Sequence, residues 1–574
     1  MWMHRNISAV IRSVAFATLI MSAPAHAQLD TTPAAQPQQA TPQAAPRLPD
    51  LLNADEWRAG LTPEDADAIR VFYTRHDFNP LWCDANGLFP RTTQLSDALR
   101  AAPREGLQLT VAQYRALGRI AAPFDADTCA ATDLLLTRAF YELAIRLGRG
   151  QLAPADIDPT WRYPAPAVDV TAMLDAIASG ADVDATVRAA APQSPDYAGL
   201  IELLARYRDI AAAGGWPRIA EKGPSLHPGD QAADVALLRR RLIVTGDLAA
   251  DADAGTLYDA DVEAAVRRFQ QRHGLADDGV VGARTRQALN VPVDARIAQI
   301  LLNLERWRWL PRHLEERYVW VNTADFTLSL HTRDQAPSTM RVIVGREERE
   351  TPAFTHLMTH LVLNPSWSVP DTIAVKDILP KELHDPGYVT RKRIHVLSGW
   401  AENAVELDPY SIDWNRYRSA RVLPFKFEQE SGQDNSLGRI KFLMPNPDSI
   451  YLHDTPSRDL FKRDARAFSS GCIRVENPLE LAAFVLGDAW NGKPVSALIQ
   501  AGKTQYVRLP EPVPVYLVYL TSWMDDAHQA QFREDIYKRD RRLTTALEAL
   551  IPTDVDRAAI GDTLAISPVG LLDR

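Results

Sequence analysis

The spacing of apolar residues changes along this chain, and that change limits the folds the chain can form. Up to about Trp309 apolar residues recur every three or four positions, which is typical of amphipathic helices. From about residue 316 they alternate with polar residues, as in 318–322 and 340–345, which is typical of strands. A chain of 574 residues is too long for one core. The pattern therefore predicts a multidomain α+β protein, with helical domains first and a mostly β domain after them.

The first 50 residues have the pattern of an export signal followed by a spacer. Arg5 and Arg12 precede a short apolar run at 14–21, and a small-residue cleavage site follows it. The run is shorter than the ~20 residues that span a bilayer, so no stable membrane anchor is expected. We predict a cleaved signal peptide over 1–27. Residues 28–50, rich in Pro, Gln and Ala, are expected to form a flexible spacer.

The first helical region, residues 51–215, has no catalytic motif and is predicted to be a scaffold domain. It contains two of the three cysteines of the chain, Cys83 and Cys129. In an exported protein these two residues could form a disulfide worth about 4 kcal/mol. Two buried free thiols are the alternative, because sequence does not show whether the two side chains are close.

Residues 224–292 are predicted to form a second, small helical unit. An apolar stripe runs along 262–269, and Gly274 ends that helix. The segments 269–275 and 278–282 resemble the three-helix peptidoglycan-binding module. A helical spacer without glycan affinity is the alternative.

The third cysteine, Cys472, lies in the motif Ser-Ser-Gly-Cys-Ile-Arg-Val, and His453 stands 19 residues upstream at the end of an apolar strand. A thiolate is the nucleophile in cysteine chemistry, and an imidazole can take the proton of the thiol. Backbone N–H groups beside Gly471 can face a tetrahedral oxyanion. The pair of motifs indicates a cysteine acyltransferase.

Four segments, 362–370, 435–442, 453–456 and 469–475, resemble the L,D-transpeptidase (YkuD-type) catalytic domain. The domain order is similar to that of the large periplasmic branch of this family in Gram-negative bacteria. The residue pattern and the resemblance together predict a catalytic domain over 316–525, and the pattern after it predicts a helical tail over 526–574. The resemblance implies a capping insertion over 370–422 and, together with the signal peptide, a periplasmic location. It also implies these site residues: Cys472 as nucleophile, His453 as general base, Gly471 and Ser470 at the oxyanion hole, Arg474 as the motif arginine, and Tyr451 and Asn435 on the substrate side.

The resemblance also implies the reaction. Cys472 would attack a peptidoglycan tetrapeptide, release D-alanine, and pass the acyl group to the side-chain amine of another stem in a 3→3 cross-link. Carbapenems would acylate the same thiol, cell-wall synthesis proteins are expected partners, and no cofactor is implied. Two alternatives stay open: hydrolysis or D-amino-acid exchange by the same acyl-enzyme, and a non-catalytic wall-binding scaffold. Many family members have a second His where this chain has Ser470, so His453 is left as the obvious base.

Other features are weighed against simpler explanations. His356 and His360 lie on a predicted strand, roughly 13 Å apart, too far for one metal ion. The basic run 391–393 could contact acidic stem peptides or form a solvated turn. Trp307 and Trp309 are expected to pack at a domain junction. The net charge of -10 argues against nucleic acid as a partner.

Overall fold

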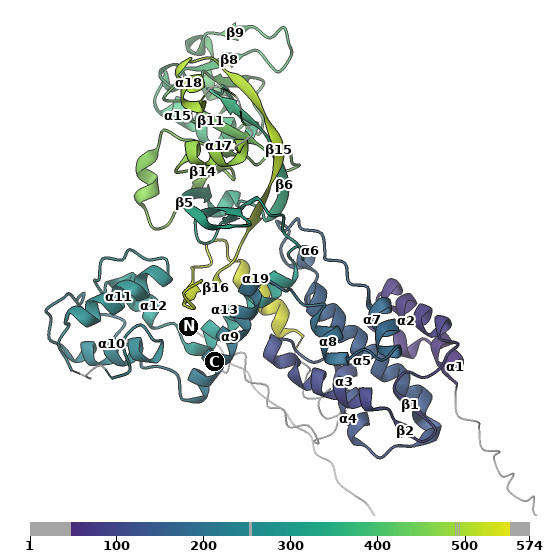
Figure 1. Cartoon of the computed structure of the whole chain (residues 1–574). Helices are drawn as coiled ribbons and strands as arrows, with labels where there is room; N and C mark the ends of the chain where they lie inside the picture. Colours follow the sequence, from purple (N-terminus) through teal and green to yellow (C-terminus); the bar gives the residue numbers. More distant parts are fainter. Residues whose placement is uncertain (1–46, 252–254, 488–489, 491, 493, 551–574) are drawn as a thin grey trace, which may run out of the picture. The chain divides into compact units, whose positions relative to one another are not determined.

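The computed structural model of the protein describes residues 47–251, 255–487, 490, 492 and 494–550 (Figure 1). The predicted signal peptide, most of the predicted spacer and the last part of the predicted tail lie outside these residues. Among the residues described, none of the helices combines the length and the apolar character that a membrane crossing requires.

Residues 47–215 are helical, as their apolar spacing predicts. Thr62, Thr110 and Ser194 start three of these helices by accepting a hydrogen bond from a first-turn N–H group. A short hairpin, β1 and β2, interrupts the series. The elements are α1 (Leu48–Asn53), α2 (Pro63–Arg75), β1 (Cys83–Asp84), β2 (Gly87–Leu88), α3 (Pro90–Ala101), α4 (Val111–Ala121), α5 (Cys129–Arg149), α6 (Pro154–Ile157), α7 (Val170–Ala178), α8 (Val183–Arg188) and α9 (Pro195–Ala212).

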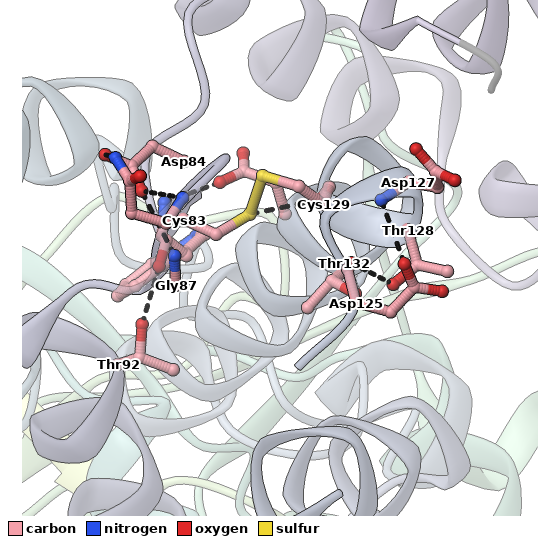
Figure 2. The surroundings of a disulfide bond; sticks show 12 residues. Cys83, Asp84, Gly87, Thr92, Asp125, Asp127, Thr128, Cys129 and Thr132 are labelled. Atoms are coloured by element: carbon pink, nitrogen blue, oxygen red, sulfur yellow. Dashed lines mark hydrogen bonds between the residues drawn. A yellow bond between two sulfur atoms is a disulfide. The ribbon is translucent and has the colours of Figure 1, made fainter. Parts of the chain in front are cut away.

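A disulfide joins the β1–β2 hairpin to α5. Cys83 in β1 is bonded to Cys129, the first residue of α5, with the two Cα atoms 6.0 Å apart (Figure 2). Nearby, the buried Asp133 carboxylate accepts hydrogen bonds from the Tyr73 hydroxyl and the Trp82 N–H, both at 2.5 Å. Of the two possibilities that the sequence left open for these cysteines, the structure contains the disulfide.

The segment 224–292 has a hydrophobic core of its own, built on three helices. The predicted apolar stripe is fully buried on one side of α11, and Gly274 follows that helix with a φ of +63°. Gln270 holds the turn after the helix, because its amide donates to Asp278 and to the Val280 carbonyl. The helices are α10 (Ala233–Val244), α11 (Ala260–Arg272) and α12 (Ala283–Leu289), with α13 (Val293–Arg308) following.

The region after residue 316 is built on a large sheet, as the alternating pattern predicts. In the described part of the chain this sheet has nine strands in the order β13-β5-β14-β12-β11-β6-β15-β3-β4, and a further β4–β5 pairing brings its two ends together like a barrel. The strands are β3 (Tyr318–Asn322), β4 (Thr327–Thr332), β5 (Gln335–Gly345), β6 (Phe354–Leu363), β11 (Ile440–Leu443), β12 (Leu452–His453), β13 (Ala467–Ser469), β14 (Ile473–Val475) and β15 (Gln505–Val518). Two helices, α17 (Pro478–Leu486) and α18 (Val495–Gln500), precede β15.

An insertion follows β6 and has a small sheet and core of its own. This sheet has four strands in the described part of the chain, in the order β7-β10-β8-β9. Its core reaches from Trp367 to Leu437, beyond the expected 370–422, because apolar residues on both sides pack into it. The elements are β7 (Trp367–Ser368), α14 (Asp371–Ile373), a π-helical turn (Ala374–Ile378), α15 (Leu379–His384), α16 (Tyr388–Arg391), β8 (Ile394–Leu397), β9 (Glu406–Leu407) and β10 (Lys426–Gln429).

The expected helical tail after residue 525 is only partly helical. Residues 530–532 alternate in burial and form β17 (Ala530–Phe532), which pairs with β16 (Ser522–Met524) in a hairpin. Helix α19 (Arg539–Glu548) follows this hairpin. Trp307 and Trp309 are buried in the core of the helical region, which agrees with a packing role.

Candidate active site

Cys472 lies in the tight turn between β13 and β14. β14 pairs in parallel with β12, so that His453 stands opposite Arg474. The Ile473 N–H donates to the Tyr451 carbonyl at 3.1 Å, which places Tyr451 beside Cys472. Because alternate residues of a strand share a face, Tyr451 and His453 lie on the same side of the sheet as Cys472 and Arg474.

The thiol of Cys472 is half-buried among polar groups. Its Sγ lies 3.8 Å from the Ser449 carbonyl oxygen, and the Tyr451 side chain lies close enough to affect its pKa. Burial raises the pKa of the thiol, and the Tyr451 hydrogen bonds and the charges of Lys441 and Arg474 offset this only in part. The resting thiol is therefore protonated at neutral pH and needs a base to become a nucleophile.

His453 is buried, with 5% of its surface exposed. Its Nδ1 lies 2.5 Å from the Asp454 carbonyl oxygen, and since a carbonyl only accepts, Nδ1 carries the proton in this hydrogen bond. Burial first, and then the positive charge of Arg474, lower the pKa of His453 to about 3. The imidazole is thus neutral, with Nε2 as its basic nitrogen, in a position one strand away from Cys472.

The turn that carries Cys472 is held by hydroxyl groups. The buried Thr351 hydroxyl donates to the Gly471 carbonyl at 2.7 Å and accepts from the Gly345 N–H at 2.9 Å. The Ser469 hydroxyl accepts from the Gly471 N–H at 3.1 Å. The N–H of Cys472 itself has no acceptor in the part of the chain that the structure describes. The Ser470 N–H likewise has no acceptor among the described residues, so these two N–H groups of the turn are free to bind an oxyanion.

Ser470 is fixed by two arginines that follow β5. Its hydroxyl oxygen accepts from Arg349 at 2.7 Å and from Arg346 at 3.2 Å. Both guanidinium groups also contact the carboxylate of Asp377, in the π-helical turn of the insertion. The insertion and the turn that carries the nucleophile are connected through this cluster.

Asn435 does not join the other candidate residues. It is buried, and its amide group donates to the Glu430 carbonyl at 2.7 Å and accepts from the Leu437 N–H at 2.8 Å. Both bonds join the Asn435 side chain to backbone groups of its own loop. Asn435 therefore shapes its own loop, which leads into β11.

Sequence reasoning missed three cationic residues of this site. The Lys441 ammonium lies 4.0 Å from the centre of the Tyr451 ring, and Lys441 stands opposite His453 in the β11–β12 pairing. Lys441 lies in a predicted strand, two residues after Arg439. This position could have indicated that its side chain lies on the face of the sheet that carries His453 and Tyr451. Arg346 and Arg349 follow a predicted strand directly, but their proximity to Ser470 depends on the β5–β13 pairing, which sequence does not reveal.

Comparison with known families assigns the three regions. Residues 67–204 match a "Scaffold domain", residues 231–289 a "Putative peptidoglycan binding domain", and residues 316–508 an "L,D-transpeptidase catalytic domain". The last match contains both Cys472 and His453. The chain contains an L,D-transpeptidase catalytic domain. The L,D-transpeptidase domain is thus the mostly β region, and the two helical regions are its scaffold and peptidoglycan-binding domains.

Individual proteins match the chain over part of its length. A Haemophilus influenzae protein named "Putative L,D-transpeptidase" is 35% identical over 249 residues, 43% of this chain and 49% of that protein. The chain therefore matches about half the length of this curated relative. A crystal structure of an L,D-transpeptidase from Xylanimonas cellulosilytica shares 16% identity, with a TM-score of 0.18, over 52% of this chain and 99% of that one. A fused Zn-dependent amidase/peptidase/peptidoglycan-binding protein from Clostridium acetobutylicum shares 12%, with a TM-score of 0.14, over 52% and 100%. TM-scores this low support no argument about the L,D-transpeptidase domain.

Proposed function

We propose that this protein is a peptidoglycan L,D-transpeptidase that forms 3→3 cross-links through an acyl-enzyme on Cys472. The thiol proton passes to Nε2 of His453 as Sγ attacks the carbonyl between the third stem residue and the terminal D-alanine. The tetrahedral oxyanion is bound by the Cys472 N–H. The imidazolium then protonates the leaving amine, D-alanine departs, and a thioester remains.

The second half of the reaction regenerates the thiol. The side-chain amine of a neighbouring stem attacks the thioester, loses its proton to His453, and forms the new amide bond as Sγ leaves and regains a proton. The observation that carries this proposal is the placement of Cys472 and His453 on paired neighbouring strands within a matched L,D-transpeptidase domain. Burial raises the pKa of the thiol and lowers that of the imidazole, which agrees with these roles. Water in place of the amine would give a carboxypeptidase, and a D-amino acid would give exchange.

We further propose that the protein acts in the periplasm, with the insertion as a cap over the catalytic cleft. The Cys83–Cys129 disulfide supports an oxidising compartment, and the contact of Asp377 with Arg346 and Arg349 supports a cap next to the nucleophile. Stem peptides as substrates, carbapenems as inhibitors and cell-wall synthesis proteins as partners belong to the same proposal.

Purified protein incubated with disaccharide-tetrapeptide tests the activity. We expect cross-linked dimers and free D-alanine by liquid chromatography and mass spectrometry, and neither product with Cys472→Ala. If the product is tripeptide without dimers, the acyl-enzyme is resolved by water, and the protein is a carboxypeptidase and not a transpeptidase. Full product formation by Cys472→Ala would refute both the transpeptidase and the carboxypeptidase reaction. A protein that binds sacculi but forms no product would be a non-catalytic scaffold.

A further inference from the structure

Arg474 is a guanidinium group without a partner beside the nucleophile. It lies two residues after Cys472 on the same face of β14, and its Nε is buried. Among the described residues its side chain forms neither a hydrogen bond nor an ion pair. A buried donor without an acceptor is costly, and most such groups in native proteins are satisfied. The vacant donor therefore points to a group that arrives with a ligand.

Arg346 presents a second unsatisfied donor next to it. Its Nη2 is shared between Ser470 at 3.2 Å and Asp377 at 3.4 Å, whereas its Nε is buried and has no acceptor among the described residues. The charge of Arg346 is close enough to Arg474 to lower the pKa of that guanidinium, after the larger effect of burial. The hydrogen bond of Arg346 to Ser470 places its side chain at the turn that leads to Cys472 and Arg474, and the two positive charges act on one another.

The carboxylate of Asp377, which the protein places beside these arginines, already has two partners. Asp377 contacts both Arg346 and Arg349, so one carboxylate serves two guanidinium groups. Arg349 also donates to Ser470 at 2.7 Å, and no nitrogen of Arg349 is left buried without an acceptor. Arg346 and Arg474 thus add, with Lys441 over the Tyr451 ring, to an excess of positive charge, and a carboxylate matches the donors of the two arginines in charge and geometry.

We propose that Arg346 and Arg474 bind the terminal carboxylate of the donor peptide and thereby select stems that end one residue beyond the scissile bond. The inference rests on the proposed function, which places the scissile carbonyl at Cys472. The carboxylate of the leaving residue is only one residue away from that carbonyl, within ~3.8 Å of chain. One more residue moves the carboxylate by up to ~3.6 Å. A pentapeptide would therefore lose this contact while keeping every upstream one.

Binding to the full chain carrying Cys472→Ala tests the site without turnover. The probes are the tetrapeptide with a free terminal carboxylate, the same peptide as a terminal carboxamide, and the pentapeptide, each followed by calorimetric titration. We expect the free acid to bind roughly tenfold to a hundredfold more tightly than the other two, the range of charge-assisted hydrogen bonds. Adding Arg346→Gln should remove most of that preference and leave the Kd of the carboxamide unchanged.

Two controls separate this site from general charge effects. Arg346→Lys keeps the charge but not the planar fork, and should retain part of the preference. Arg391→Gln, in the exposed basic run of the insertion, should retain all of it. Equal Kd values for acid and carboxamide in the parent protein, a preference that survives Arg346→Gln, or one that disappears with Arg391→Gln would overturn the inference.

Failure of the proposed function gives a different result. A protein with Cys472 intact that releases no D-alanine refutes the transpeptidase chemistry, whatever the binding data show. If D-alanine leaves the tetrapeptide and D-alaninamide leaves the carboxamide analogue with the same kcat/KM, the carboxylate site is refuted and the chemistry stands.

Discussion

The buried, neutral state of His453 makes the stability of the L,D-transpeptidase domain depend on pH. The folded pKa of about 3 lies below the ordinary value of 6.5. As pH falls below 6.5 the unfolded chain binds a proton that the folded chain does not. The contribution of the neutral imidazole is therefore complete above pH 6.5 and is lost progressively towards pH 3.

The size of the effect follows from the same shift. One pKa unit corresponds to about 1.4 kcal/mol, so between pH 6.5 and pH 5 His453 should cost about 2 kcal/mol of stability. For a domain of this size, about 2 kcal/mol corresponds to a change in Tm of about 4–8 °C. Substitution of His453 by Gln removes the titrating group and should remove this part of the pH dependence.

Differential scanning calorimetry of wild type and His453→Gln at several pH values from 7 to 5 measures the effect. The difference between the two proteins is informative, because other groups titrate equally in both. We expect the Tm of the transition that the substitution shifts to fall by about 4–8 °C more in wild type. Parallel pH profiles would refute the conclusion that the folded protein keeps this imidazole neutral.

Three other perturbations test the loop beside Asp454, the disulfide of the helical domain and the turn that carries Cys472. Gly438→Ala and Gly502→Ala both place a side chain at positive φ, +61° and +72°, and each should lose about 1–2 kcal/mol in denaturant unfolding. Only Gly438→Ala would also place a Cβ 2.4 Å from the Asp454 carboxyl carbon, so only that variant should slow D-alanine release, by about tenfold or more. Cys129→Ser should cost the helical domain about 4 kcal/mol, measured by calorimetry, and reductant should reproduce the loss in wild type. Thr351→Val should leave the buried Gly345 N–H without an acceptor, cost about 1–3 kcal/mol and slow acylation, whereas Thr351→Ser should do neither.

Each of these perturbations has a contrary outcome. Equal activity losses in the two glycine variants would show that the backbone strain, and not the contact with Asp454, affects the site. A melting temperature that reductant does not change in wild type would contradict a stabilising disulfide. Acylation by Thr351→Val at the wild-type rate would show that this hydroxyl does not position the turn.

Periodicity and motif were enough to place most elements of the L,D-transpeptidase domain. The alternating pattern over 318–322 and 340–345 is confirmed as β3 and the end of β5. The pattern failed for the short strands β8 and β9, and for β17, since two to four residues are too few for alternation to stand out. The extent of the insertion was missed because its core draws apolar residues from both flanks.

In the candidate site too, residues in local sequence motifs could be predicted, whereas residues that strand pairing brings together could not. The motif residues Cys472 and His453 were found from sequence because each stands in a distinctive local pattern. Arg346 became visible only through the sheet, which brings the end of β5 beside the Cys472 turn. Asn435 was chosen from its motif alone, and the structure shows its amide bonded to the backbone of its own loop.

The central claim is that Cys472 carries the acyl group. Intact-mass analysis during reaction with disaccharide-tetrapeptide, followed by peptide mapping, tests it directly. We predict a mass increase equal to the donor minus D-alanine, located on the peptide that contains Cys472 and absent from Cys472→Ala. D-alanine release without a Cys472 adduct, or an adduct that persists in Cys472→Ala, would contradict the account.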